Sequence, residues 1–404
     1  MPDIVESAET SKLLDELTTL AGREDPYPRY ARLREISPVV RAEDGALVVT
    51  GHADCATVTR DGRLGHMPKH MLAFIGLADW ADHPALRQLF SSMLTLNPPD
   101  HTRLRRLVSS TFTARRVQAL RPAIEAMVDD LLAEMSGPAD FVGAFAFRLP
   151  VNVIGELLGV PAEDRPAFQS VVRDWSQVLE SIGPEVLETA DPAAATLRGY
   201  LAELAAERRR APQDDLISAL VAAEEAGDRL TEDELLTTAG LLFAAGFETT
   251  TNLLANGLVA LLQHPAQLAA LRERPALAPS AVEELLRFDS PVQLASRVVY
   301  EPVELGGMTI EPGERVVAYL GAGNRDPERF DDPDRLDLER ADNAPLSFGG
   351  GIHYCLGAPL ARLEAQVAFP ALLGRFPDIE LAGEPERRDS LTIRGLTQLP
   401  VVAK

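Results

Sequence analysis

The sequence predicts a mainly α-helical protein with a small β-rich region. Apolar residues recur at the three- and four-residue spacing of amphipathic helices over most of the 404 residues. Strand-like alternation is confined to a few short stretches that cluster in pairs. No internal repeat, low-complexity run or long linker separates one part of the sequence from another. We therefore expect a single domain that spans residues 1–404.

The helical pattern is strongest in Glu232–Gln263, which is apolar nearly all round and is expected to cross a large core. Other expected helices are shorter and are bounded by proline, glycine or polar residues. In chain order, the expected helices are Leu13–Leu20, Tyr27–Ile36, His101–Phe112, Arg115–Met135, Val153–Leu158, Arg165–Leu179, Ala193–Arg210, Asp214–Glu225, Glu232–Gln263, Pro265–Arg272, Ser280–Phe288 and Pro359–Phe376.

The strand signals fall in three places. Val39–Val49 is expected to form a hairpin around a Glu-Asp-Gly turn. Arg297–Leu320 alternates around Gly306-Gly307 and Pro312-Gly313, and Leu391–Val402 is expected to add a final strand pair.

Composition excludes several classes of function. A formal net charge of −22 argues against nucleic acid or an anionic membrane surface as partner. Two cysteines, Cys55 and Cys355, form no disulfide framework and suit a reducing compartment, with Cys55 expected in the core. The polar N-terminus predicts no signal peptide or membrane anchor. The apolar segment Leu235–Leu262 contains Glu248, which would be costly in lipid, so we expect a cytoplasmic protein.

Cys355 lies in a glycine-rich stretch, Phe348-Gly-Gly-Gly-Ile-His-Tyr-Cys-Leu-Gly357, that leads into an amphipathic segment. Converging backbone N–H groups and a helix N-terminus favour a thiolate, and Pro359 suits the first helical turn. His353 adds a donor for an anionic ligand. One thiolate without a second cysteine nearby suits a metal centre, with haem iron as the leading candidate. The alternative is a buried structural cysteine in an ordinary turn.

Five positions of this stretch match the haem-binding signature Phe-x-x-Gly-x-His-x-Cys-x-Gly, and the chain thereby resembles the cytochrome P450 family. The resemblance implies a triangular helical prism with a small β region that binds haem b. It also implies that Cys355 is the axial ligand of the haem iron. The matching positions are Phe348, Gly351, His353, Cys355 and Gly357.

A polar cluster, Ala245-Gly-Phe-Glu-Thr-Thr250, interrupts the longest helix, and such a cluster marks a kink or a site. Thr249 could equally bond the carbonyl four residues earlier, and Glu248 could pair with an arginine. The resemblance implies that this segment lies across the distal face of the haem. It assigns Thr249 to hold the reacting oxygen, Glu248 to relay protons, and small Ala245 to leave room for oxygen and substrate.

Glu284 and Arg287 have the i, i+3 spacing of a helical ion pair, which is common on solvated helices. Their apolar surroundings favour burial, and the family places a Glu-x-x-Arg motif here as a structural network. The family completes the network with a further arginine. Arg335 and Arg329 are the candidates, and Arg335 is preferred for its distance from Phe348.

His101 and Arg105 lie one helical turn apart, which also fits a solvated basic face. The resemblance implies that both contact the haem propionates together with Arg297 and His353. It further implies a proximal docking face for an acidic ferredoxin at a concentration of arginines, namely Arg103, Arg106, Arg115, Arg116 and Arg362.

His66 and His70 have the spacing of a metal-binding helix, but Pro68 disfavours that helix and no further ligand completes a set. We therefore do not expect a metal there. In the family, residues 64–96 form a variable loop over the substrate pocket. Further pocket residues are expected at Leu241, Leu242, Ala245 and Leu294.

The resemblance implies a monooxygenase that hydroxylates or epoxidises a hydrophobic small molecule with O2, and a macrolide-type polyketide is the leading substrate. Only 49 residues follow Cys355, so NAD(P)H electrons are expected through a separate ferredoxin reductase and ferredoxin. The default oligomeric state is a monomer. The alternatives are a thiolate-haem sensor without turnover, a peroxide-driven enzyme or isomerase of the family, and a haem-free helical protein.

Overall fold

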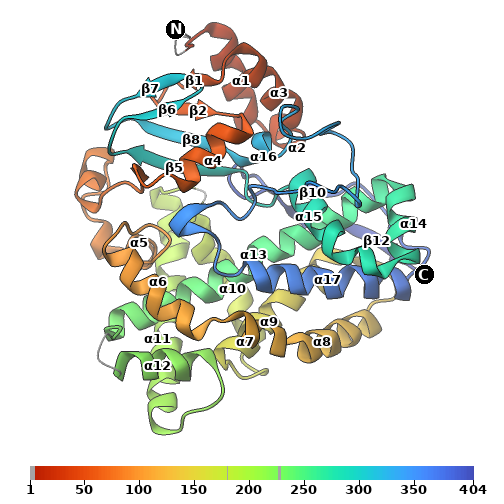
Figure 1. The fold of residues 1–404 in the computed structure, drawn as a ribbon. Coiled ribbons are helices and arrows are strands. Elements are labelled where there is room, and N and C mark those ends of the chain that lie inside the picture. Colours follow the sequence, from red (N-terminus) through yellow and green to blue (C-terminus); the bar gives the residue numbers. More distant parts are fainter. Residues whose placement is uncertain (1–4, 180, 226–228) are drawn as a thin grey trace.

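Helices make up most of the computed structural model, which describes residues 5–179, 181–225 and 229–404 (Figure 1). The first four residues of the polar N-terminus lie outside the described residues. The helices are α1 Ala8–Thr18, α2 Leu20–Glu24, α3 Tyr27–Ile36, α4 His52–Arg60, α5 Pro84–Phe90, α6 Asp100–Thr111, α7 Ala114–Ala119, α8 Arg121–Glu134, α9 Arg148–Leu158, α10 Phe168–Ser176, α11 Pro184–Arg210, α12 Leu216–Glu225, α13 Glu232–Gln263, α14 Pro265–Glu273, α15 Ala278–Phe288, α16 Leu320–Gly323 and α17 Ala358–Arg375.

The largest sheet has the strand order β1-β2-β8-β5-β3, in which β2 and β8 run parallel and the other neighbours antiparallel. It lies with α1 and α3 at one end of the molecule (Figure 1). The strands are β1 Val39–Arg41, β2 Leu47–Val49, β3 Leu64–Gly65, β4 Gly137–Asp140, β5 Leu294–Val299, β6 Val303–Leu305, β7 Met308–Ile310, β8 Arg315–Tyr319, β9 Glu380–Leu381, β10 Glu386–Arg387, β11 Leu396–Gln398 and β12 Pro400–Ala403.

Helix α13 forms the centre of the helical region. It packs against α9, α11 and α17, and Figure 1 shows α13 and α17 running side by side through the middle of the molecule. A capping box at Thr231 and Glu234 begins α13, since each side chain bonds the other residue's backbone N–H. Most of its residues are buried, as the near-continuous apolar sequence predicts. This packing places the polar cluster of α13 deep in the molecule.

The bounds of α3 and α13 agree with the sequence prediction. The prediction of a single helix over Arg115–Met135 is wrong. The helix is interrupted at Leu120, and a second helix, α8, follows with Pro122 in its first turn. Helices α4 and α5 were not predicted. Among the described residues, no helix is both long and apolar enough to span a membrane.

The predicted terminal strand pair is also wrong. β11 and β12 do not pair with each other: β11 pairs with β10, whereas β12 lies between β4 and β9. Val402 of β12 lies opposite Pro138 of β4, so the C-terminus is tied to a segment far away in the sequence. Local alternation indicates a strand but carries no information about such a distant partner.

Candidate active site

The glycine-rich stretch forms a tight loop that presents Cys355 at the N-terminus of α17. Gly349 and Gly351 have φ values of 66° and 59°. A Cβ at Gly351 would come within 2.9 Å of the backbone of Arg60, so no other residue fits without movement. The Cys355 amide donates to the carbonyl of Phe348 at 3.0 Å, which closes the loop. Cys355 is accessible in the structure, whereas Cys55 is buried.

Opposing effects act on the sulfur of Cys355. Desolvation by the surrounding protein raises the pKa of the thiol, whereas the backbone N–H of Gly357 and the guanidinium of Arg105 act to lower it. Arg362 acts in the same direction and lies over the ring of Phe348, with the guanidinium carbon 4.5 Å from the ring centroid. The loop therefore offers one sulfur surrounded by hydrogen-bond donors and positive charge.

One face of α13 stays accessible within an otherwise buried helix. Leu242 and Thr249 are half-buried and Ala245 is exposed, and their spacing of three and four residues puts them on the same side. The Thr249 hydroxyl donates to the carbonyl of Ala245 at 3.2 Å. This is the bond to the carbonyl four residues earlier that the sequence analysis gave as the alternative to a functional role. Of the other expected pocket residues, Leu241 is buried and Leu294 is half-buried at the start of β5.

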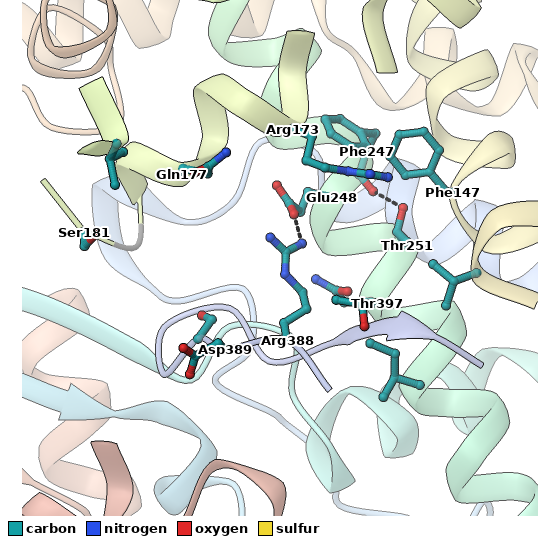
Figure 2. Close-up of a pocket in the computed structure, with 15 residues that line it drawn as sticks. Phe147, Arg173, Gln177, Ser181, Phe247, Glu248, Thr251, Arg388, Asp389 and Thr397 are labelled. Atoms are coloured by element: carbon teal, nitrogen blue, oxygen red, sulfur yellow. Dashed lines mark hydrogen bonds and ion pairs between the residues drawn. The ribbon is translucent and has the colours of Figure 1, made fainter. Parts of the chain in front are cut away.

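Glu248 pairs with Arg388, which lies between β10 and β11 (Figure 2). The glutamate is only 5% exposed, and its Oε2 has no hydrogen-bond partner among the described residues. Both residues border a cavity of about 380 Å³, which Arg173, Gln177 and Thr251 also line. The arrangement provides a buried acid beside a polar cavity.

Around the loop, several arginine and histidine side chains converge that form no ion pair with a described carboxylate. The rings of His101 and His353 lie 4.0 Å apart between centroids, and both nitrogens of buried His101 lack a hydrogen-bond partner within the part of the chain that the structure describes. Arg297 is 9% exposed, and burial lowers its pKa to about 10. Arg105 donates to the carbonyl of Tyr354 at 2.6 Å rather than to a carboxylate. The structure thus brings together all four residues expected at the propionates.

This donor set fits haem. Buried guanidinium and imidazole groups are costly without an anion, and the two propionates of haem b would supply one. The single accessible sulfur of Cys355 suits iron with one protein thiolate. Among the described residues, no group of three or more His, Cys, Asp or Glu side chains could hold a bare metal ion.

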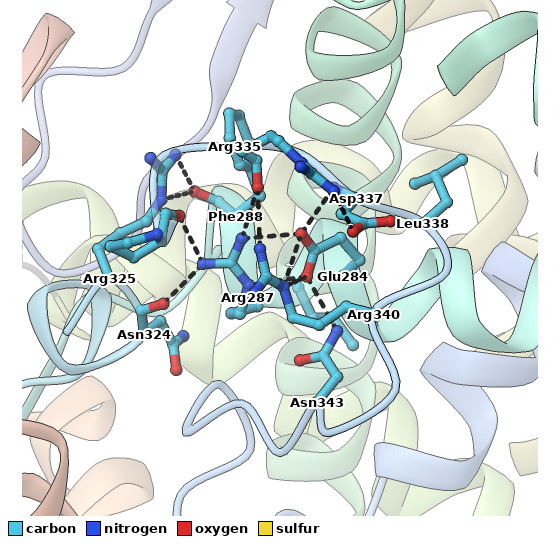
Figure 3. Close-up of polar contacts among 12 residues, drawn as sticks. Glu284, Arg287, Phe288, Asn324, Arg325, Arg335, Asp337, Leu338, Arg340 and Asn343 are labelled. Atoms are coloured by element: carbon cyan, nitrogen blue, oxygen red, sulfur yellow. Dashed lines mark hydrogen bonds and ion pairs between the residues drawn. The ribbon is translucent and has the colours of Figure 1, made fainter. Parts of the chain in front are cut away.

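Glu284 and Arg287 form a fully buried, bidentate ion pair (Figure 3). The prediction that the side chain of Arg335 is the third member is wrong, because this side chain is 63% exposed and bonds Asp337. Arg340 takes that place instead, with its Nε 3.3 Å from Glu284 Oε2 and its side chain 11% exposed. Only the carbonyl of Arg335 joins the network, since Arg287 and Arg340 both donate to it.

The expected basic docking face is weaker than its sequence indicates, because three of its arginines are paired within the chain. Arg103 pairs with Glu234 and Arg116 pairs with Asp214. Arg362 is held by Glu283, which also raises its pKa. Positive charge on this face is therefore largely neutralised by acidic neighbours.

Three residues of the site were missed in the sequence. His66 was set aside as half of a decoy metal pair, yet its ring lies 4.6 Å from that of His353. Arg388 and Arg340 lie in loops, where no periodic pattern identifies a partner. No local signal could have identified His66, because its position depends on the long-range pairing of β3 with β5.

The family model described as Cytochrome P450 matches residues 76–274 and 275–400 of this chain. Cytochrome P450 107B1 of Saccharopolyspora erythraea is 45% identical over 394 residues, which cover 94% of this chain and 96% of that relative. The vitamin D(3) 25-hydroxylase of Pseudonocardia autotrophica is 44% identical over 388 residues and 94% of either chain.

The polyketide biosynthesis cytochrome P450 PksS of Bacillus subtilis is 40% identical over 395 residues, which cover 93% of this chain and 95% of PksS. A solved structure of PksS matches with a TM-score of 0.84 and covers 96% of this chain and 99% of that one. The similarity thus extends over nearly the whole chain and is not confined to the loop around Cys355.

Proposed function

Because the chain belongs to the cytochrome P450 family of haem-dependent monooxygenases, we propose that it hydroxylates or epoxidises a hydrophobic polyketide of the macrolide type. Dioxygen is the co-substrate, and NAD(P)H electrons arrive through a ferredoxin reductase and a ferredoxin. The observation that carries the proposal is the accessible Cys355 thiol next to a cluster of arginine and histidine side chains. In this cluster Arg297 is buried, and both nitrogens of His101 lack a hydrogen-bond partner among the described residues.

Cys355 would bind the haem iron through its sulfur, and the propionates would be held by His101, Arg105, Arg297 and His353. Phe348, Gly351 and Gly357 would shape the loop around the sulfur. Bound in this way, haem supplies the activation of dioxygen and the transfer of one oxygen atom to an unactivated C–H bond or an alkene. Positive charge beside the propionates would fix the orientation of the ring.

The residues of α13 would control protons and space. The Thr249 hydroxyl lies on the accessible face of the helix, where it can donate to the reacting oxygen once its bond to the Ala245 carbonyl is released. Glu248 lies one residue earlier beside the polar cavity, where its carboxyl group can exchange protons with water. Ala245 leaves space beside both. The pairing of an acid with an alcohol argues for turnover rather than for sensing alone.

Two relatives support different substrate classes. PksS is named for polyketide biosynthesis, and the Pseudonocardia relative is named for vitamin D(3). Both kinds of molecule are large and apolar, as expected for a pocket bordered by Leu241, Leu242 and Leu294. We favour a macrolide-type polyketide.

Electron delivery requires a surface close to the thiolate. Ile352 and Tyr354 are 50% and 40% exposed beside Cys355, which supports a partner surface with an apolar centre. Several arginines around this surface are paired with acidic neighbours. They would therefore steer an acidic ferredoxin less strongly than their number in the sequence indicates.

The test uses purified holoprotein, a reconstituted ferredoxin system and isotopically labelled dioxygen. Macrolactones and secosteroids are first screened by the change in the Soret band on binding. Incorporation of one labelled oxygen atom into a macrolactone supports the proposal. Incorporation into secosteroids alone would contradict the substrate class, and turnover with peroxide but not with dioxygen would contradict the proposed electron route.

A further inference from the structure

His66 is placed beside Arg297 by the pairing of two strands. In the antiparallel pair of β3 and β5, Leu64 lies opposite Val299 and Gly65 opposite Val298. Strand β3 ends at Gly65, and its register continued by one residue would bring His66 opposite Arg297. The proximity is supported by the electrostatic effect of Arg297 on His66. Residues directly opposite in an antiparallel pair project from the same face of the sheet. The fold therefore brings this imidazole to a residue that the haem-binding pattern already includes.

The backbone of His66 is held firmly in this position. Its N–H donates to the side-chain carbonyl of Asn97 at 2.8 Å, and the Asn97 amide donates back to the His66 carbonyl at 2.8 Å. The Tyr300 hydroxyl donates to the same carbonyl at 2.8 Å. A Cβ at Gly65 would come within 2.7 Å of the Asn97 side chain, so the packing here is close. Such support limits the conformational freedom of the following imidazole.

The imidazole ring of His66 contrasts with its well-bonded backbone. Its Nε2 is buried without a hydrogen bond among the described residues, as are both nitrogens of His101 and the Nε2 of His353. The groups that act electrostatically on His66 are Arg297, His353 and His101, and each of them disfavours a positive charge there. No described carboxylate forms an ion pair with His66, His101, His353 or Arg297, and the Arg297 guanidinium donates to the carbonyl of Ser296. A buried donor in such a group needs an acceptor from outside the chain.

We propose that His66 is a further cofactor-binding residue, whose Nε2–H donates a hydrogen bond to a haem propionate beside Arg297. This rests on the proposed function, because it requires bound haem. A neutral imidazole offers one N–H donor, and a charge-assisted bond to a carboxylate is stronger than a neutral one. The bond would satisfy a nitrogen that is otherwise buried without a partner.

The test compares three variants of the full chain. His66→Phe keeps an aromatic ring against His353 but removes the donor, whereas His66→Gln keeps a donor. His70→Phe is the matched control, since His70 is exposed on the neighbouring 3₁₀ segment Lys69–Ile75. The rate of haem transfer to excess apomyoglobin is measured for each holoprotein. We expect transfer about tenfold faster in His66→Phe, nearly unchanged in His70→Phe, and intermediate in His66→Gln.

Two further readouts separate a haem contact from a structural role. The haem-free form of His66→Phe should unfold at the same temperature as the haem-free parent or higher, because a buried unpaired nitrogen is removed. The midpoint potential of the bound iron should fall in His66→Phe, since the propionate charge is less well neutralised. Haem transfer at the parent rate would overturn the proposal, and so would a loss of stability in the haem-free variant that accounts for the faster transfer. A parent protein that retains no haem would instead contradict the proposed function.

Discussion

Glu248 in the middle of α13 and Arg388 in the loop between β10 and β11 form an ion pair at the wall of a cavity with a mixed polar and apolar lining (Figure 2). The arginine is 23% exposed at its side chain and the glutamate 7%, so the pair links a buried acid to the cavity. The acid expected to relay protons is therefore anchored by a residue far away in the sequence.

The first prediction concerns the strength of this pair. Removing either partner leaves the other poorly solvated, so Glu248→Gln and Arg388→Gln should each lower the free energy of unfolding by about 1–3 kcal/mol. The double substitution should cost clearly less than the sum, because it removes the interaction only once. Urea unfolding of the four proteins measures the coupling. If the costs of the two single substitutions sum to the cost of the double substitution within about 0.5 kcal/mol, the two residues do not interact in solution.

The second prediction tests Thr249. Thr249→Val should bind haem normally but form less product per NAD(P)H consumed, with more hydrogen peroxide released. Thr250→Val is the matched control: its hydroxyl also donates to the carbonyl four residues earlier, at 3.3 Å, but it lies on a buried side of α13. Product and peroxide are quantified against NAD(P)H in the reconstituted system. Equal coupling in the two variants would remove Thr249 from its assigned role.

The third prediction contrasts two arginines near Glu284. Arg340→Ala should lower the free energy of unfolding by about 1.5–3 kcal/mol, because it removes charged hydrogen bonds to a buried carboxylate. Arg335→Ala should stay within about 0.5 kcal/mol of the parent, since its side chain is mostly exposed. Chemical unfolding of both haem-free variants measures the difference. A larger loss of unfolding free energy in Arg335→Ala than in Arg340→Ala would show that Arg335, and not Arg340, supports the network.

The fourth prediction concerns pH and the contact between α5 and α11. His83 Nδ1 lies 2.7 Å from Asp191 Oδ2, and Asp191 also accepts from the Ala85 amide at 2.9 Å. The hydrogen bond to Asp191 is the main cause that raises the pKa of His83 above its ordinary 6.5, and Asp79, 3.6 Å away, adds to it. A raised pKa means that the protonated contact stabilises the fold fully below about pH 6.5. This contribution is lost as pH rises through the raised value.

The melting temperature of His83→Gln should therefore fall furthest below that of the parent near pH 6, and the gap should narrow towards pH 9. His70→Gln is the control, since it removes another histidine that is exposed and forms no ion pair with any described residue. A gap that stays constant with pH would mean that the contact does not depend on the charge of His83.

Local signals in the sequence identified most of the helical framework and the Cys355 loop. The bounds of α13 followed from its continuous apolar pattern, and the loop followed from glycines whose positive φ values the structure shows. The expected propionate residues were named by resemblance, and the fold brings His101, Arg297 and His353 together. Local patterns succeed here because each depends on residues that are neighbours in the chain.

Interactions between distant segments were not predictable in the same way. The choice of Arg335 over Arg329 rested on spacing alone, and Arg340 was not among the candidates. Burial and the path of the loop decide which side chain reaches Glu284. The partners of β12 and the pair of Glu248 with Arg388 depend on the assembled fold. His66 was considered only as half of a metal-binding pair and was set aside, but it follows a short strand whose partner ends near Arg297.

The ligation of haem iron by Cys355 is tested most directly by the visible spectrum of the reduced protein with carbon monoxide. The parent should show the strongly red-shifted Soret band of an anionic thiolate on iron, and Cys55→Ala should show it too, because Cys55 is buried in the sheet region. Cys355→Ala should lose that band. An unshifted band in the parent, or a shifted band that survives in Cys355→Ala, would contradict the assignment of Cys355 as the ligand.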